Sequence, residues 1–509
     1  MKTVVNVLNR LFSRSLCSSV TTNCDKPSVN ALKSFDAIPG PKPVPLFGNK
    51  WRYLPIIGEY RVDEMDVNGE IRLKKFGKVV REVLDKDLTI VHVFDPKDIE
   101  AVFRQEGKYP LRRSHRALLK YRKDRPHRYA SGGLFPENGQ QWYSLRKQFQ
   151  HHLLNATNVS TYIADCEDIT IQLIDYIRSK RDINHEISDF LNDLYLWSLE
   201  NTGVLALDSR LGCLNTNLSE DSDAKLMIRA AHETNDAVMR TERTDAWFTK
   251  DTSDYQMLVS AQDAMTNIID KYMNQKTNES LNTDLKKDKT IFAQLLNNPN
   301  VDRKDLFAMI VDLFVAGIDT TAFTAGFALY HLSRNTTAQN RLRDEINSIL
   351  KSDCLTADNL SQMSYLKACV KETMRLSPVT FGNGRVTSQQ MIINDYCIPK
   401  GTQIITQNQV SCRQSEYFSD PLSFIPERWL KSDTNIYPNN KVSPFLVLPF
   451  GYGPRMCIGR RFAEMEINVF LAKIIQNYRI EYHYEDIKVK TRLINVPDKP
   501  LKFKFVDII

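Results

Sequence analysis

The stretch that most constrains this chain is Phe450–Gly459, which reads Phe-Gly-Tyr-Gly-Pro-Arg-Met-Cys-Ile-Gly. Glycines let the backbone turn tightly, Phe450 offers an apolar cover, and Arg455 offers a fixed positive charge for an anionic partner. Residues 460 to about 478 are predicted to be helical, so Cys457 would lie at a helix N-terminus, which lowers a thiol pKa and favours the thiolate. The stretch predicts a loop that presents Cys457 to a metal. A buried, inert cysteine is the alternative.

The spacing of this loop, Phe-x-x-Gly-x-Arg-x-Cys-x-Gly, resembles the haem-binding loop of the cytochrome P450 (haem-thiolate monooxygenase) family. The resemblance implies haem b as the cofactor, Cys457 as the ligand of its iron, and Phe450 and Arg455 as haem contacts. It also implies the family's fold, which is mainly α with small β-sheets (α+β). One haem-enclosing domain would comprise residues 38–509.

Composition is compatible with one large domain and argues against several other classes. A chain of 509 residues with 42% apolar residues can bury a large core. The formal charge of +7 is not gathered into one basic run, so nucleic acid is not an expected partner. Nine cysteines without a C-x-x-C pair favour a reducing compartment. Uninterrupted apolar runs are far shorter than the ~18–20 residues that span a bilayer, so no spanning anchor is expected.

Residues 1–37 are predicted to be a mitochondrial transit peptide and a disordered N-terminus. Lys2, Arg10 and Arg14 make the start of the chain basic, Ser and Thr are frequent there, and apolar residues can share one helical face. An uninformative disordered terminus is the alternative. The proline-rich segment Ile38–Gly48 that follows is expected to be stiff and extended.

Trp142 and Arg146 are four residues apart and would share one face of a helix. An indole N–H and a guanidinium can both donate hydrogen bonds to carboxylates. Taken by itself, such a pair is more often a half-buried surface pair than a carboxylate-binding site. The family resemblance implies that Trp142, Arg146 and Arg385 contact the haem propionates. The basic segment Arg112–Arg128 is expected to be a solvated connection.

Residues Asp302 to about Arg334 predict the longest helix of the chain. Asp302 suits the N-cap position. The residues from Leu306 to Val315 are apolar almost all round apart from Asp312, so the helix is expected to run through the core.

Inside this helix lies the segment Ala316–Thr321, which reads Ala-Gly-Ile-Asp-Thr-Thr. A threonine hydroxyl can bond the carbonyl of residue i−4, so the segment is expected to bend or open the helix beside room for a small molecule. The resemblance implies that Asp319 and Thr320 are catalytic residues that manage protons. A small-residue packing site with a buried polar pair is the alternative.

Glu372 and Arg375 lie one turn apart on a helix predicted over Tyr365–Leu376, and can form a bidentate pair. Glu-x-x-Arg by itself is common on protein surfaces. The segment Phe424–Trp429 follows at the family's spacing, which implies that Arg428 completes a Glu–Arg–Arg cluster. Its implied role is structural, in support of the haem loop.

Basic residues lie beside these motifs, namely Lys367 and Lys371 on the predicted helix, and Arg460 and Arg461 after the cysteine. At ~100° per residue the lysine row lies about a quarter turn from the Glu372 row, so it can face solvent. Solvated charge on an exposed helix is the alternative. The resemblance to mitochondrial members of the family implies that these residues dock an acidic [2Fe–2S] ferredoxin, which is reduced by its NADPH-dependent reductase.

At a finer scale the chain resembles the arthropod mitochondrial steroid hydroxylases, and among them the ecdysteroid C22-hydroxylases. The segments that carry this resemblance are Ala316–Thr321, Leu329–Asn335, Thr406–Arg413 and Leu493–Asp498. It implies O2-dependent hydroxylation of an ecdysteroid precursor at C22, in ecdysone biosynthesis, by an enzyme bound peripherally to the matrix side of the mitochondrial inner membrane. The alternatives are a mitochondrial monooxygenase of foreign lipophilic compounds and a haem sensor or carrier without turnover.

Overall fold

The computed structural model describes residues 32–45, 47–281, 290–350, 354–430 and 442–508. The predicted transit peptide lies largely outside the described residues. The described chain is mainly helical, as expected. Its α-helices are α2 (Met65–Phe76), α3 (Pro96–Gln105), α4 (Arg116–Lys123), α5 (Gly139–Leu153), α6 (Ala156–Ser160), α7 (Ile163–Lys180), α8 (Leu191–Leu207), α9 (Asp223–Thr241), α10 (Ser253–Leu281), α11 (Ile291–Leu296), α12 (Arg303–Ser333), α13 (Thr336–Ile349), α14 (Ala357–Gln362), α15 (Ser364–Leu376), α16 (Asn408–Ser411) and α17 (Arg460–Asn477). Short 3₁₀ turns are η1 (Phe35–Ala37), η2 (Lys50–Tyr53), η3 (Ala246–Phe248) and η5 (Pro426–Trp429).

The strands form small sheets. They are β1 (Val79–Val83), β2 (Thr89–Val93), β3 (Glu186–Ile187), β4 (Gly384–Val386), β5 (Met391–Ile393), β6 (Tyr396–Ile398), β7 (Gln403–Thr406), β8 (Tyr478–Glu481), β9 (Val489–Thr491), β10 (Asn495–Pro497) and β11 (Phe503–Asp507). The largest sheet has the order β1-β2-β7-β4, with β2 and β7 parallel and the other neighbours antiparallel. Strands β1 and β2, which are adjacent in the sequence, form its antiparallel hairpin. The remaining sheets have the orders β3-β11-β8, β10-β9 and β5-β6.

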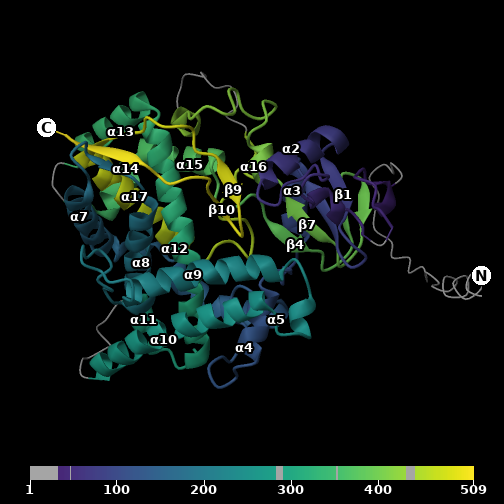
Figure 1. The fold of residues 1–509 in the computed structure, drawn as a ribbon, viewed down its shortest axis with the longest axis horizontal. Helices are drawn as coiled ribbons and strands as arrows, with labels where there is room; N and C mark the ends of the chain where they lie inside the picture. The colour runs from purple at the N-terminus through teal and green to yellow at the C-terminus, as the bar shows by residue number, and fades with distance from the viewer. Residues whose placement is uncertain (1–31, 46, 282–289, 351–353, 431–441, 509) are drawn as a thin grey trace, which may run out of the picture.

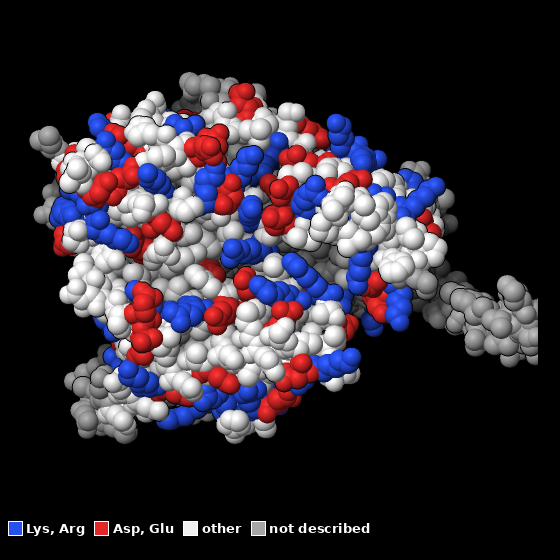
Figure 2. All heavy atoms as spheres, viewed as in Figure 1, with Lys and Arg blue, Asp and Glu red and all other residues white. Residues whose placement is uncertain are grey.

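Figure 1 shows the largest sheet with α2 and α3 at one end of the molecule, and the long helices at the other. Helix α12 passes through the middle of the helical part, and α9 and α10 run side by side below it in the view. On the face in Figure 2, Lys and Arg are intermixed with Asp and Glu, so the positive charge is not concentrated on this face.

Helix α12 begins and ends close to the predicted positions. Asp302 is its N-cap, and the carboxylate accepts a hydrogen bond from the backbone N–H of Lys304 at 2.7 Å. Its length and apolar composition would suffice to cross a membrane, but 78% of the most apolar window is buried within the protein. The helix is therefore the centre of the core.

Helix α8 lies directly against the middle of α12. A Cβ atom on Gly317 would come within 2.7 Å of the Thr202 hydroxyl oxygen, so only glycine permits this approach. The Ser198 hydroxyl on α8 donates a hydrogen bond to the Gly317 carbonyl at 3.0 Å. These contacts fix the part of α12 that carries the predicted catalytic residues.

Candidate active site

The Phe450–Gly459 stretch forms a tight loop in front of α17. Gly451 and Gly453 have φ angles of 69° and 77°, in the left-handed region that glycine adopts at no steric cost. The backbone N–H of Cys457 donates to the Phe450 carbonyl at 2.8 Å and closes the loop. Gly459 is the N-cap of α17, so Cys457 lies just before the helix, where the sequence places it.

The Cys457 side chain is exposed to solvent, although surrounding protein atoms raise the pKa of its thiol through burial. The side chain is therefore accessible to solvent but crowded by protein atoms. The N–H of Gly459 and the charges of Arg146 and Arg112 lower the pKa, but burial outweighs them. The expected lowering of the thiol pKa is therefore wrong for the protein alone. A coordinated metal ion would deprotonate the thiol outright.

Arg455 joins the loop to α5. The Cζ atom of its guanidinium lies 4.2 Å from the centre of the Trp142 ring, and both side chains are buried. Its Nη2 donates to the Asn138 side chain at 3.1 Å and also to the Glu137 carbonyl. Burial, together with the nearby charge of Arg385, lowers the pKa of Arg455 to about 9.

Arg385 on β4 lies near the Arg455 guanidinium. We call the arginines gathered here, namely Arg112, Arg146, Arg385 and Arg455, the arginine cluster. Its Nε donates to the Glu106 carboxylate at 2.5 Å. The space beside Gly453 is also taken by Glu106, whose carboxylate would collide with a Cβ on that glycine. Glu106 therefore links the sheet to the cysteine loop.

Arg112 also belongs to this cluster, which corrects the expectation that its segment is a solvated connection. Its Nη2 donates to the Arg455 carbonyl at 2.9 Å. Burial and the charges of Arg385, Arg455 and Arg146 hold its pKa well below the usual value. Farther along the segment, Arg122 is fully buried and contacts Asp312 of α12 at 2.6 Å.

The cluster is buried, positively charged and short of acceptors. Arg146 on α5 donates to Gln150 at 3.2 Å, and burial lowers its pKa to about 10. The Nε and Nη1 atoms of Arg455 are buried without a hydrogen-bond partner among the described residues. Anionic carboxylates would supply both the missing charge and the missing acceptors. The residues therefore fit a haem whose propionates lie among them, with Cys457 available to its iron.

On α12, the residues from 306 to 330 are all buried except Ala316, Gly317 and Thr320, which are partly exposed. The Thr320 hydroxyl donates to the Ala316 carbonyl at 2.6 Å, the i−4 bond expected from the sequence. Helix α12 nevertheless continues as α-helix through this segment, so the predicted opening of its backbone is wrong. The space beside the helix is instead left by the small residues Ala316 and Gly317.

Asp319 is buried and points toward α9 instead of into the core. Its Oδ2 accepts a hydrogen bond from the Asn235 amide at 2.8 Å, and its Oδ1 lies 2.9 Å from Nε2 of His232. Neither α9 residue stands out in the sequence. A pair three positions apart facing the predicted acid is visible only once the helices are placed.

Next to Thr320, the Thr321 hydroxyl donates to the carboxyl of Glu466 on α17 at 2.9 Å. The other oxygen of Glu466 is buried without a hydrogen-bond partner among the described residues, and burial raises the pKa of this carboxyl to about 8. The protonated form is thus the stable one at neutral pH.

The structure brings Glu372, Arg375 and Arg428 together. Arg375 contacts Glu372 through Nε and Nη2 at 2.8 and 2.7 Å, and Arg428 Nε lies 3.3 Å from the same carboxylate. The indole N–H of Trp429 donates to it at 2.9 Å. The cluster holds α15 against η5.

Lys367 and Lys371 are exposed on α15, and Arg461 is exposed on α17. The Nζ atom of Lys371 lies 4.0 Å from the centre of the Trp429 ring. Burial and the charge of Arg460 lower the pKa of Lys371. Both lysines line an open surface groove of about 870 Å³, together with Arg341, Asp344, Glu345, Ser348, Ser364, Tyr365, Ala368, Trp429 and Leu430.

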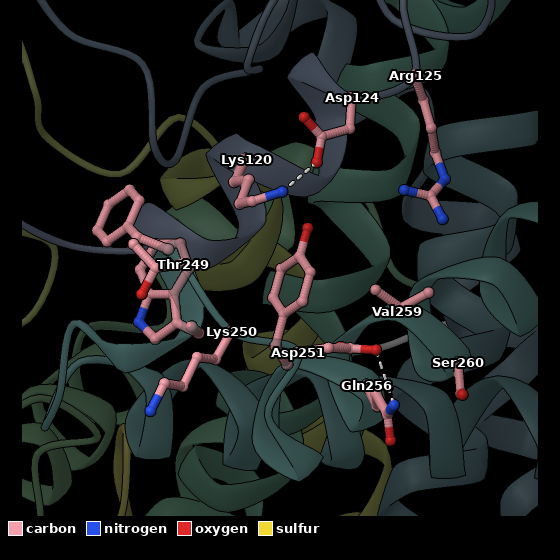
Figure 3. Close-up of a pocket in the computed structure, with 12 residues that line it drawn as sticks. Lys120, Asp124, Arg125, Thr249, Lys250, Asp251, Gln256, Val259 and Ser260 are labelled. Carbon is pink, nitrogen blue, oxygen red and sulfur yellow. Dashed lines mark hydrogen bonds and ion pairs between the residues drawn. The ribbon is translucent and has the colours of Figure 1, made fainter.

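A second open groove, of about 620 Å³, lies between α4 and the start of α10. Figure 3 shows Lys120, Asp124 and Arg125 on one side of it, and Asp251, Gln256 and Ser260 on the other. Its lining mixes opposite charges and includes none of the predicted cofactor-binding or catalytic residues. The groove is therefore separate from the site around Cys457.

A cysteine loop, a cationic cluster and a central helix with small residues together define a haem-thiolate site. The sequence profile of the family described as "Cytochrome P450" matches residues 38–505. The chain belongs to the cytochrome P450 family, and it is a haem monooxygenase with haem b as its cofactor.

Curated relatives extend over nearly the whole chain. "Cytochrome P450 302a1, mitochondrial" of Drosophila melanogaster is 35% identical over 487 residues, covering 94% of this chain and 96% of the relative. "Probable cytochrome P450 49a1" of the same organism is 35% identical over 512 residues, covering 97% and 86%. "Ecdysone 20-monooxygenase", also of Drosophila melanogaster, is 27% identical over 483 residues, covering 92% and 88%.

Proposed function

We propose that this protein is a mitochondrial monooxygenase that hydroxylates an ecdysteroid precursor at C22, in ecdysone biosynthesis. The observation that carries the proposal is the near-complete alignment with insect relatives, one described as mitochondrial and another as acting on ecdysone. The sequence segments that resemble ecdysteroid C22-hydroxylases support the choice of position.

In this proposal Cys457 is the iron ligand, and Phe450 covers the loop. Trp142, Arg146, Arg385 and Arg455 hold the haem propionates. Arg112 joins them because it shares their buried charge.

The bound haem supplies the oxygen chemistry, and the chain supplies protons and substrate pose. Asp319 and Thr320 deliver protons from α12, where Thr320 is one of the few partly exposed residues. Glu372, Arg375 and Arg428 are structural, because their buried contacts join α15 to η5.

Electrons would come from an acidic [2Fe–2S] ferredoxin and its NADPH-dependent reductase. Lys367, Lys371, Arg460 and Arg461 form the proposed docking patch. It is supported by the exposure of Lys367, Lys371 and Arg461 and by the proximity of the partly exposed Arg460 to Lys371. The proposed location is the matrix side of the mitochondrial inner membrane. Exposed apolar side chains such as Ile56, Ile57 and Phe248 support peripheral contact with a membrane.

The test is product analysis after reconstitution of the haem-loaded protein with ferredoxin, its reductase and NADPH. A ketodiol-type ecdysteroid precursor would be compared with other sterols and with a panel of lipophilic drugs. Conversion of the ketodiol to its C22-hydroxylated product at the highest kcat/KM supports the proposal. Preferred turnover of the drugs would favour a monooxygenase of foreign compounds, and absence of turnover would favour a sensor or carrier.

A further inference from the structure

Asp319 lies beside a histidine that reaches solvent. His232 and Asn235 are three residues apart on α9, so they share one helix face. Each takes one oxygen of the Asp319 carboxylate, at 2.9 Å and 2.8 Å respectively. The His232 side chain is 37% exposed, whereas that of Asp319 is 7% exposed.

The surroundings of His232 fix its ring but leave one side open to water. The ring packs edge-to-face on Tyr195 of α8, with ring centres 4.5 Å apart, and Tyr195 in turn contacts Phe323 of α12. The titratable groups that face it are Asp319 of α12 and Tyr195 of α8. Burial, and then the charge of Asp319, raises the pKa of the Tyr195 phenol, which therefore stays neutral. Arg229, Glu233 and Asp236 flank His232 on α9 itself.

A buried carboxylate that gives away protons repeatedly needs a source that renews them. Imidazole is the side chain whose ordinary pKa allows both protonation states near neutral pH. The Nε2–H bond is not aligned on Oδ1 well enough for a hydrogen bond. Rotation of the imidazole ring alone would align the Nε2–H bond on Oδ1 and complete a proton path from solvent to Asp319. Helices α9 and α12 need not move closer together.

We propose that His232 is a positioning residue that acts through Asp319, by orienting its carboxylate and passing it protons from solvent. In each transfer the Nε2–H bond of the imidazolium breaks and an O–H bond forms on Oδ1 of Asp319. A hydronium ion of the solvent then gives a proton back to Nε2 of the imidazole and becomes water, and no electron moves. This inference rests on the proposed role of Asp319 in proton delivery.

The test uses the full-length haem-loaded protein with ferredoxin, reductase and NADPH, and the panel compound that the wild type converts fastest. His232→Gln keeps a hydrogen-bond donor near Asp319 but cannot carry a proton, whereas His232→Ala removes both. The matched control is His483→Gln, because exposed His483 also lies 2.9 Å from a carboxylate, that of Glu481, outside the site. Haem content and melting temperature establish that each variant is folded.

Both His232 variants should lower kcat and the product formed per NADPH by about tenfold or more, with little change in KM for the substrate. In the wild type and in His483→Gln, kcat should depend on pH, and this dependence should be absent in both His232 variants. A His232→Gln variant with wild-type coupling and pH dependence would overturn the inference.

Asp319→Asn separates the two proposals: if it lowers coupling while His232→Gln does not, only the role of His232 is wrong. If Asp319→Asn leaves coupling unchanged, the proposed proton delivery by Asp319 is itself wrong.

Discussion

The guanidinium of Arg455 stacks on the indole of Trp142, with 4.2 Å between Cζ and the ring centre. The stack joins the loop of Cys457 to α5 and places Arg455 beside Arg385 and Arg112. Such a concentration of buried like charge is unfavourable by itself, as the lowered pKa values of Arg455 and Arg112 show. A bound dianion would reverse this, so haem binding and the stability of the cluster should be coupled.

Replacement of Arg112 tests this coupling. Arg112→Ala should weaken haem retention about tenfold or more, because it removes a charge-assisted contact from a desolvated site. The measurement is the haem-to-protein ratio after gel filtration and the rate of haem transfer to a scavenger protein. Arg113→Ala, from the same segment, is the control. Equal haem loss from both variants would mean that Arg112 has no special place in the cluster.

The close approach of α8 and α12 predicts a specific overpacking effect. Gly317→Ala should destabilise the protein by about 1–3 kcal/mol, because the new Cβ would lie 2.7 Å from the Thr202 hydroxyl oxygen. Thr202→Ala removes that oxygen and should restore part of the loss in the double variant. Thermal unfolding of both single variants and the double variant measures this coupling. Strict additivity would show that the contact is not the cause.

The raised pKa of the buried Glu466 carboxyl predicts that the free energy of unfolding depends on pH. Its folded-state pKa of about 8 lies above the ordinary value of 4.5, so the folded protein binds the proton more tightly than the unfolded chain. Its contribution to stability is therefore present below about pH 4.5 and is lost as pH rises toward about 8. Glu466→Gln should gain stability relative to the wild type across this range, by a few kcal/mol at most.

Urea unfolding at several pH values between about 5 and 8 gives the measurement. Glu464→Gln, on the partly exposed side of the same helix, is the control for loss of a carboxylate from α17. Parallel stability curves for wild type and Glu466→Gln would contradict the assignment of a protonated buried carboxyl.

The proposed docking patch predicts that the apparent KM for ferredoxin depends on these lysines and on the salt concentration. Lys367→Ala combined with Lys371→Ala should raise the apparent KM for ferredoxin several-fold at low ionic strength, and the difference should shrink with added salt as charges are screened. A charge-matched control is Lys86→Ala with Lys97→Ala, at exposed positions on the β1–β2 turn and α3. An unchanged KM for ferredoxin would remove the docking proposal.

Local patterns predict much of this architecture. The cysteine loop depends on residues within ten positions of one another, and the start of α12 follows from its N-cap residue Asp302. The mainly helical fold with small sheets, which the family resemblance implies, is confirmed by the match to the family. The loop and the start of α12 can be predicted because the residues that cause them are close together in the sequence.

Contacts between residues that are far apart in the sequence cannot be predicted from local patterns. Arg112 sits in a segment that looks solvated by composition, and only the fold brings it against the Arg455 carbonyl. The same holds for the contacts of Asp319 with His232 and of Thr321 with Glu466. The direction of the Cys457 pKa shift cannot be inferred from the loop sequence either, because burial outweighs the Gly459 N–H and the nearby arginines.

The central claim is that Cys457 provides the thiolate ligand of a haem held by the arginine cluster. The most direct measurement is the absorption spectrum of the reduced carbon monoxide complex of the wild type and of Cys457→His. The wild type should show the red-shifted Soret band of a thiolate-ligated haem, and the variant should show the band of a histidine-ligated haem. A variant that keeps the thiolate-type band would contradict the claim.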